Sequence, residues 1–288
     1  MQNRENRFYK IGTTIIEYEG PAFSERDNLK LFRIEKEMPH IKFKLVPEKV
    51  IEIPEIPLVW EEEYIHRYET ENQKIRIIYN QKKTKVLMKD CCYDGFHHHV
   101  EYDVNYMIYW DTNMMMKLFE LPIHLLNEGG VFLHASYIIW KDKAILFTAP
   151  KQTGKSTQAA LWSKYNGAEI INGDRAFIKK EKGLWMAHGS PYCGTSGICK
   201  NISAPIGAIV ILSQADKNKI RRAKTIEAFI TMMEGCTYEK RLKSHICKVT
   251  DIVKEIVTDI SFYQLACLPD KSAVDILEEV LWKRESTE

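Results

Sequence analysis

The stretch Thr148-Ala-Pro-Lys-Gln-Thr-Gly-Lys-Ser-Thr157 decides the fold that this sequence predicts. The apolar run Ala144-Ile-Leu-Phe147 precedes it, and the helix-like run Gln158-Ala-Ala-Leu-Trp162 follows it. A strand, a tight loop ending in Gly-Lys-Ser and a helix form a phosphate cradle, because the backbone N–H groups of the loop and the helix N-terminus face the anion. We therefore expect a nucleotide-phosphate site here, the alternative being a chance turn.

Each position of this loop has an expected role. Lys155 should reach the β- and γ-phosphates, and the hydroxyl of Ser156 should hold Mg²⁺. The usual pattern begins with glycine, whose conformational freedom that position often needs, so Ala149 weakens the match. The residues expected around the phosphates are Ala149, Pro150, Lys151, Gln152, Thr153, Gly154, Lys155, Ser156 and Thr157.

Size and composition indicate a soluble globular protein. The 288 residues suffice for one large or two smaller domains, with 45% hydrophobic and 28% charged residues. A net charge of +2 gives no bulk electrostatic reason to bind nucleic acid or a membrane. No apolar run approaches the roughly 18–20 residues that span a bilayer, and residues 1–7 are polar with no signal-peptide core behind them. We expect a cytoplasmic protein with neither nucleic acid nor a membrane as partner.

Cysteine and histidine patterns indicate no separate metal centre. The seven cysteines are scattered and form no C-x-x-C pair, so neither a disulfide framework nor a zinc site is expected. The run from His97 to His99 has the composition of a metal-binding tract. On a strand, however, alternate side chains point to opposite faces and cannot all ligate one ion.

Periodicity predicts two domains of different character. Residues 1–110 contain runs that alternate apolar and polar residues, among them Phe8 to Tyr18 and Lys74 to Tyr79, which is typical of half-buried sheet. Near residue 111 the pattern changes to a helix over 111–126, kinked at Pro122, followed by strands at 131–140 and 143–148. The predicted fold is thus α+β to α/β, a β-rich N-terminal domain (1–110) followed by a phosphate-loop domain (111–288).

Two residues outside the loop are candidates for chemistry. Asp174 ends the strand that follows the loop helix, and in a parallel sheet that position lies near the carboxyl edge, where ligands bind. Phosphoryl transfer needs such a carboxylate, to hold Mg²⁺ or to accept the acceptor's proton, although Asp174 could also be a simple turn residue. His134, on the strand before the loop strand, is either catalytic or packed. The Gly-rich segment 189–197 either approaches a ligand or is an irregular connection.

Together these residues resemble the catalytic domain of the HPr kinase/phosphorylase family, whose phosphate loop is related to that of phosphoenolpyruvate carboxykinases. The family pattern is a strand with His and a small residue, a Gly-rich phosphate loop and a strand ending in an Asp pair. Here the corresponding residues are His134-Ala135, the segment 149–156 and Asp174-Arg175. The resemblance covers 131–180, extends loosely to the C-terminus, and implies a C-terminal domain of the HPr kinase type.

The resemblance implies roles and also shows departures. It implies that His134 and Asp174 act together as the base that activates a serine hydroxyl, that Lys155 binds the phosphates, and that Ser156 binds Mg²⁺. The loop is depleted in small residues at 151–153, and Arg175 replaces the second Asp of the family. Arginine cannot bind a metal but could stabilise the transferring charge. Kinase chemistry is therefore expected, whereas the reverse phosphorylase reaction is doubtful.

The first functional hypothesis is an ATP- and Mg²⁺-dependent kinase that phosphorylates a serine of a peptide or protein, with the N-terminal domain docking the substrate. The chain is similar to shorter HPr-kinase-like proteins linked to ribosomally made peptides, including lasso-type precursors, and it lacks a recognisable HPr-docking segment. A kinase of small alcohols is one alternative. A nucleotide-responsive binding protein without catalysis is another, for which Ala149 and Arg175 would mark lost activity. The acceptor, the base preference and the oligomeric state stay open.

Overall fold

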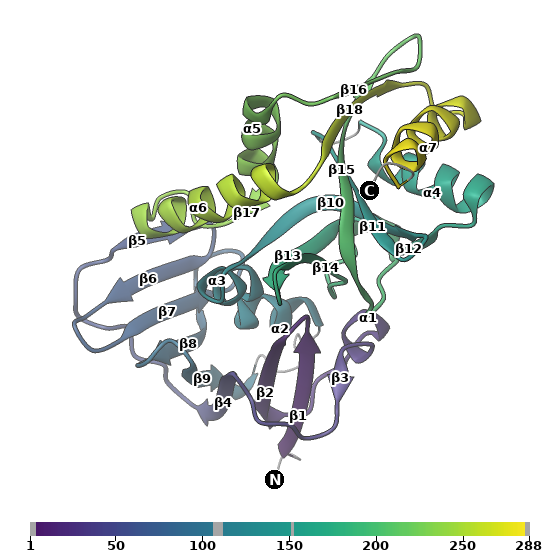
Figure 1. The fold of residues 1–288 in the computed structure, drawn as a ribbon. Helices are drawn as coiled ribbons and strands as arrows, with labels where there is room; N and C mark the ends of the chain where they lie inside the picture. The colour runs from purple at the N-terminus through teal and green to yellow at the C-terminus, as the bar shows by residue number, and fades with distance from the viewer. Residues whose placement is uncertain (1–3, 106–111, 151–152, 286–288) are drawn as a thin grey trace. The chain divides into compact units, whose positions relative to one another are not determined.

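The computed structural model describes residues 4–105, 112–150 and 153–285, and the chain forms two compact units, Met1–Phe119 and Glu120–Glu288 (Figure 1). Both units are mixed α and β. The single helix expected over 111–126 is wrong. Two helices, α2 (Thr112–Phe119) and α3 (Leu121–Asn127), are separated by Glu120, whose φ of 41° is left-handed and ends the helical hydrogen bonding. Pro122 causes no kink, because it lies in the first turn of α3, where proline is accommodated.

The N-terminal unit is built on a nine-stranded sheet with the order β3-β1-β2-β4-β9-β8-β7-β6-β5. Strand β4 runs parallel to β2 and β9, and the other neighbours are antiparallel. The elements are β1 (Arg4–Ile11), β2 (Thr14–Pro21), α1 (Asp27–Lys30), β3 (Arg33–Ile34), β4 (Ile41–Glu48), β5 (Trp60–Glu62), β6 (Ile65–Glu69), β7 (Lys74–Tyr79), β8 (Val86–Cys92), β9 (His97–Asp103) and α2. The run from Phe8 to Tyr18 is a hairpin, because Gly12 turns the chain with a φ of 58°.

Aromatic packing joins α2 to this sheet. The ring of Phe119, at the end of α2, lies 5.8 Å from that of Tyr9 and 5.1 Å from that of Phe43, centroid to centroid. All three side chains are buried. Large rings that bury their whole surface contribute strongly to the hydrophobic stabilisation of such a unit.

A buried ionic network lies beneath α2. Asp90, only 1% exposed, accepts hydrogen bonds from Nε of Arg76 (2.8 Å) and pairs with Nδ1 of His98 (2.9 Å). Arg76 also donates to the carbonyl of Leu118 (2.7 Å), which lies in the last turn of α2. Burial alone would raise the pKa of Asp90, but the charges of Arg76 and His98 outweigh it and lower that pKa to about 2. Burial opposes protonation of His98, yet Asp90 raises the pKa of His98 to about 9.

The C-terminal unit contains a sheet with the strand order β11-β10-β13-β14-β15-β18-β16. Two further strands, β12 and β17, both pair with β10. In addition, β11 pairs with β15. Strands β11, β15 and β18 are parallel to one another. The elements are α3, β10 (Gly130–Trp140), β11 (Lys143–Thr148), α4 (Lys155–Asn166), β12 (Glu169–Asn172), β13 (Arg175–Glu181), β14 (Leu184–His188), β15 (Ser203–Gln214), β16 (Lys219–Arg222), α5 (Thr225–Gly235), β17 (Cys236–Thr237), α6 (Lys243–Asp259), β18 (Phe262–Cys267) and α7 (Lys271–Glu285). The strands expected at 131–140 and 143–148 are confirmed.

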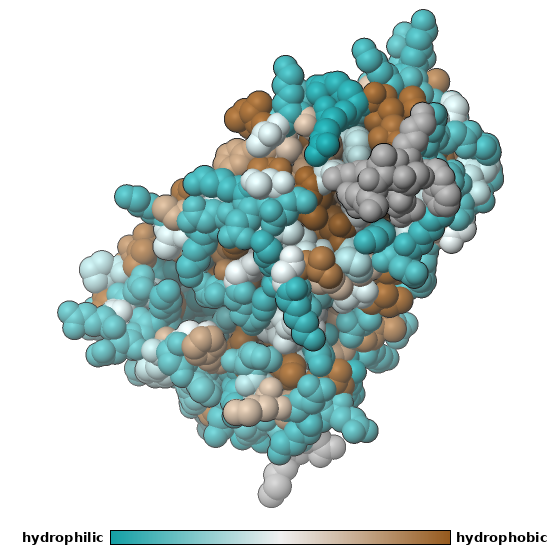
Figure 2. Space-filling model, viewed as in Figure 1, coloured by the Kyte–Doolittle hydropathy of each residue, from teal (hydrophilic) through white to brown (hydrophobic). Residues whose placement is uncertain are grey.

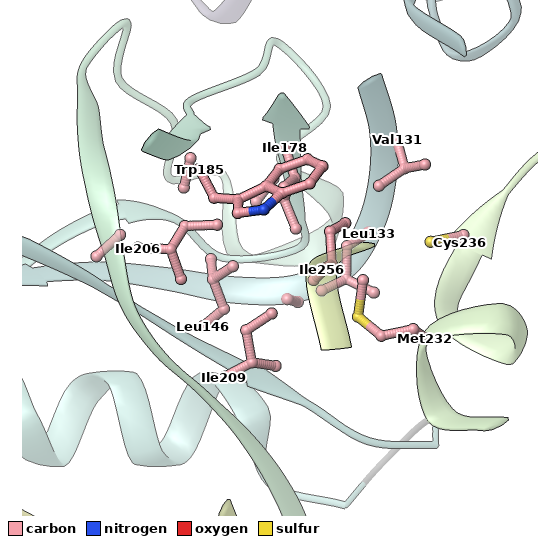
Figure 3. Close-up of a cluster of buried hydrophobic side chains, with 14 of the residues drawn as sticks. Val131, Leu133, Leu146, Ile178, Trp185, Ile206, Ile209, Met232, Cys236 and Ile256 are labelled. Atoms are coloured by element: carbon pink, nitrogen blue, oxygen red, sulfur yellow. The ribbon is translucent and has the colours of Figure 1, made fainter. Parts of the chain in front are cut away.

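Helices cover both faces of the parallel strands in this unit (Figure 1). On one face, α5 and α6 bury Met232 and Ile256 against Leu146 and Ile209 (Figure 3). On the other face, α4 and α7 pack against residues of β11, β15 and β18 that include Phe147, Val210 and Leu265. Strands β11, β15 and β18 contribute buried residues to both clusters, as expected for strands whose sequences are largely continuous apolar runs.

Polar residues dominate the surface that is visible in Figure 2, with smaller hydrophobic patches between them. Among the residues that the structure describes, no helix is both long enough and apolar enough to cross a membrane.

The buried network generates a stability prediction. Asp90→Asn keeps the shape of the side chain but leaves Arg76 and His98 without their counter-charge, so we expect the N-terminal unit to lose about 3–5 kcal/mol of unfolding free energy. Hydrogen exchange of β7–β9 measured against urea concentration would report it. Asp27→Asn is the matched control, because the Asp27 side chain is 98% exposed and its loss should change stability by about 0.5 kcal/mol or less. Equal stability of the two variants would contradict the role of the network.

The same network predicts a pH dependence. The pKa of His98 rises from 6.5 to about 9 on folding, so its stabilisation is complete below pH 6.5 and is lost as the pH rises through about 9. The unfolding free energy of the N-terminal unit should therefore fall over this window in the wild type and stay flatter in His98→Gln. The difference between the two curves isolates His98 from other titrating groups. Parallel curves would show that His98 is not charged in the folded protein.

Candidate functional site

The predicted loop connects β11 to α4 as the sequence analysis expected. Strand β11 ends at Thr148, and α4 begins at Lys155 with Gly154 as its N-cap. Gly154 has a φ of 104°, a conformation that strongly favours glycine. The hydroxyl of Thr153 donates a hydrogen bond to the carbonyl of Pro150 (2.9 Å), which tightens the loop. Lys151 and Gln152, also expected near the phosphates, lie outside the described residues.

Ala149 does not need the glycine of the usual pattern. Its backbone is outside the left-handed region, so an alanine adopts it without strain. Its side chain is buried in the cluster that includes Phe147, Ala159 and Trp162, beneath the start of α4. The methyl group of Ala149 therefore adds core packing, and the conformational demand falls on Gly154 instead. The departure that weakened the sequence match has a local structural reason.

Lys155 is held inside the loop. Its side chain is largely buried, and Nζ donates hydrogen bonds to the carbonyls of Ala149 (3.0 Å) and Pro150 (3.1 Å). Burial lowers the pKa of Lys155, and the negative charge of Asp174 partly offsets this shift. The ammonium group thus lies at the loop, where a bound anion would meet it.

Ser156 and Thr157 lie in the exposed first turn of α4. The hydroxyl of Ser156 donates to the carbonyl of Gly173 at 3.4 Å. Gly173 directly precedes Asp174, so this contact joins the start of α4 to the end of β12. The helix N-terminus and the candidate carboxylate therefore belong to one local structure.

Strand β10 positions His134 beside Asp174 and Arg175. His134 lies opposite Arg175 in the antiparallel pair of β10 and β13, and the N–H of Ala135 donates to the carbonyl of Asp174 (3.0 Å). Asp174 was expected to follow a strand of a parallel sheet, but β12 pairs antiparallel with β10, and its last residue, Asn172, forms an antiparallel bridge with Cys199. Because β11 is also antiparallel to β10, β12 and β11 run in the same direction and end at the same edge. Asp174 thus reaches the expected edge by a different pairing.

His134 and Arg175 contact the carboxylate of Asp174. Nε2 of His134 lies 3.3 Å from Oδ1, and Nε of Arg175 lies 3.4 Å from Oδ2. The hydrogen bond with His134 lowers the pKa of Asp174 most; burial opposes the shift, and the charges of Arg175 and Lys155 add to it. Asp174 is therefore ionised at neutral pH. Arg175 is fixed in turn by a hydrogen bond from Nη1 to the hydroxyl of Thr237 on β17.

One cavity of about 990 Å³ collects these side chains. It is lined by residues 153–158, by residues 173–175 and by His134. Thr195 and Ser196, from the Gly-rich segment, also line it. The opposite wall comes from the ends of β15 and β18, at 214–215 and 267–269, which the sequence analysis missed. The order of the strands could have indicated these residues, because ligands of α/β sheets bind where parallel strands end.

The residues present fit a magnesium ion that arrives with phosphates. Ser156 and Asp174 line the same cavity and offer a hydroxyl and an ionised carboxylate, oxygen ligands of the kind that Mg²⁺ prefers. Within the described ranges, no three His, Cys, Asp or Glu side chains gather as a metal site. Mg²⁺ usually keeps several waters and one or two carboxylates beside substrate phosphates, which suits this sparse protein ligation.

No family model matches this chain, and no curated protein matches it. Among solved structures, the chain is similar to that of the Hpr(Ser) kinase/phosphatase from Coxiella burnetii, with 12% sequence identity over 54% of this chain and 90% of that chain. The TM-score of this match is 0.31. A likeness of this size carries no argument about activity, so the functional conclusion rests on the residues of the site.

The packing of the loop generates a prediction about its two ends. Ala149→Gly restores the usual loop pattern but removes a buried methyl group and frees the backbone, so we expect the C-terminal unit to lose about 1–2 kcal/mol of stability. Gly154→Ala should cost a similar amount, about 1–2 kcal/mol, because it forces a left-handed alanine. Urea unfolding followed by the hydrogen exchange of β11 and α4 would measure both. Stabilisation by Ala149→Gly would show that this position does favour glycine.

Proposed function

We propose that the protein is an ATP- and Mg²⁺-dependent kinase that transfers the γ-phosphate to a serine hydroxyl of a peptide or protein. The observation that carries the proposal is the single cavity in which Lys155 and Ser156 meet His134, Asp174 and Arg175. A phosphate cradle and a carboxylate aimed at the same space are the two parts that phosphoryl transfer requires.

The loop supplies the binding half of the site. The N–H groups at the start of α4 and the positive end of its dipole favour phosphate oxygens. Lys155 exchanges its hydrogen bonds to the two loop carbonyls for hydrogen bonds to phosphate. Ser156 and Asp174 would hold Mg²⁺, which would supply positive charge to neutralise the charge that develops during transfer.

Asp174 and His134 supply the transfer half. The carboxylate of Asp174 is ionised, accepts a hydrogen bond from the incoming hydroxyl and orients it toward the γ-phosphorus. The hydroxyl proton passes to the Asp174–His134 pair, whose nearest atoms are 3.3 Å apart. His134 stays in place because its backbone pairs with Arg175 of β13 and its carbonyl accepts a hydrogen bond from the hydroxyl of Thr148 (3.2 Å).

Arg175 favours the forward reaction. Its guanidinium lies beside Asp174 and is held by Thr237, so a fixed positive charge faces the cavity. Such a charge stabilises negative charge on the transferring phosphoryl group. The acceptor class rests on the family resemblance of residues 131–180, which implies a serine in a peptide or protein.

The site predicts that two substitutions separate binding from transfer. Lys155→Ala should weaken the binding of Mg²⁺-ATP about 10- to 100-fold, because hydrogen bonds to a charged group are lost. Asp174→Asn should weaken the binding of Mg²⁺-ATP less than Lys155→Ala does, and should lower transfer about 10²- to 10⁴-fold. Calorimetry would measure binding, and labelled ATP with a serine-centred peptide library would measure transfer. Lys164→Ala, an exposed lysine on the same helix, is the matched control and should behave like the wild type.

The outcomes also separate the alternative activities. Phosphorylation of small alcohols with no labelling of the peptide library would replace the proposed acceptor by a metabolite. Tight binding of ATP with no transfer to any acceptor, unchanged in Asp174→Asn, would indicate a nucleotide-responsive binding protein. Transfer at the wild-type rate in either Lys155→Ala or Asp174→Asn would reject the site itself.

A further inference from the structure

The 3₁₀ turn Gly194–Ser196 is built against the candidate carboxylate. Gly194 has a φ of 54°, and a Cβ atom added to it would lie 2.7 Å from Cγ and 2.9 Å from Oδ1 of Asp174. No side chain fits in that space, so the backbone of the turn approaches the carboxyl group as closely as glycine allows. The sequence alone left open whether this segment approaches a ligand or merely connects two strands.

Several contacts fix the turn to the end of β12. The N–H of Gly173 donates to the carbonyl of Ile198 (3.2 Å), and Asn172 forms an antiparallel bridge with Cys199. Gly173 also faces the side chain of Ser196, which would collide with any Cβ at that position. The turn and Asp174 are therefore parts of one local structure, and the position of the turn relative to the carboxylate is set by the backbone.

The two hydroxyl groups of the turn have different surroundings. The hydroxyl of Ser196 donates to the carbonyl of Cys193 (2.7 Å) and accepts from the N–H of Ile198 (3.2 Å), so it is engaged in the turn itself. The side chain of Thr195 is exposed, lines the same cavity as Lys155 and Asp174, and forms no hydrogen bond with the residues described. Thr195 follows Gly194 by one Cα step, about 3.8 Å.

We propose that Thr195 is a site of self-phosphorylation in cis, a modification that deepens the proposed kinase function and rests on it. Oγ1 of Thr195 forms a bond to the γ-phosphorus of ATP, and the bond from that phosphorus to the bridging oxygen of the β-phosphate breaks. The electron pair leaves with ADP. The hydroxyl proton passes to the carboxylate of Asp174, next to which the turn is held. No further reactant is needed.

The consequence is a change of charge in the cavity. A phosphothreonine adds about −1.5 to −2 charges at neutral pH. This charge would lie in the same cavity as Lys155 and Arg175. Since the cavity also holds the proposed acceptor subsite, the modified turn would occupy space that a second hydroxyl substrate needs.

The test uses the full-length protein with ATP and MgCl₂, and intact-mass and fragment-mass spectrometry as the readout. We expect one added phosphoryl group, mapped to Thr195, with a first-order rate constant that does not change over a tenfold range of protein concentration. Thr195→Val should remove the label while binding Mg²⁺-ATP like the wild type, and Thr195→Ser should restore it as phosphoserine. Asp174→Asn should slow the labelling about 10²- to 10⁴-fold.

Other outcomes distinguish this proposal from the proposed function. Transfer to the serine-centred peptide library with an unmodified Thr195 would overturn the self-phosphorylation and leave the kinase standing. A label on another residue, or a rate that rises in proportion to protein concentration, would also overturn it. If neither Thr195 nor the serine library is labelled above the level of an alanine-centred control library, both proposals are rejected.

Discussion

Strand β10 changes its neighbouring strands partway along its length, and the candidate site depends on this change. Residues 130–134 of β10 pair with β13, whereas residues 135–140 pair with β11 and β12. The change falls between His134 and Ala135, where His134 faces Arg175 and Ala135 faces Thr148. One strand therefore fixes the start of the loop that follows β11 and the histidine–aspartate pair at once. Because all of these contacts involve backbone hydrogen bonds, the distance between the two halves of the site is set by sheet geometry.

This arrangement also determines which charged groups lie together in the cavity. Asp174 is the acidic group of the cavity, and His134, Arg175 and Lys155 all favour its ionised form. In the family that the sequence resembles, a second Asp occupies the position of Arg175, so the charge at this position is more positive by two units in this chain. The guanidinium also takes a fixed direction from Thr237. In the proposed function, the site would therefore bind a metal with help from the ligand's own phosphates, and Arg175 would offer a preset positive charge to the group in transfer.

The sequence predicted the parts of the site that depend on local interactions. The strand, loop and helix around Lys155 could be found because a few neighbouring residues decide them, whereas Asp174 reaches the expected edge through an antiparallel pairing that was not expected. The break at Glu120 was missed, because a left-handed glutamate has no sequence signature, and Pro122 drew attention to the wrong residue. The antiparallel pairing of β12, the packing of Ala149 and the wall at 214–215 and 267–269 depend on contacts between distant segments. A single sequence does not specify such contacts.

The internal hydrogen bonds of Lys155 have a consequence for selectivity. Two main-chain carbonyl oxygens solvate the ammonium group, which would otherwise be buried without compensation. In the proposed function, an entering anion has to compete with these carbonyls for the lysine. A lone inorganic phosphate or sulfate provides little extra anchorage with which to do so, whereas a polyphosphate chain engages the helix terminus and the lysine together. In the proposed function, the loop therefore favours a polyphosphate over weak anions from the surrounding solution.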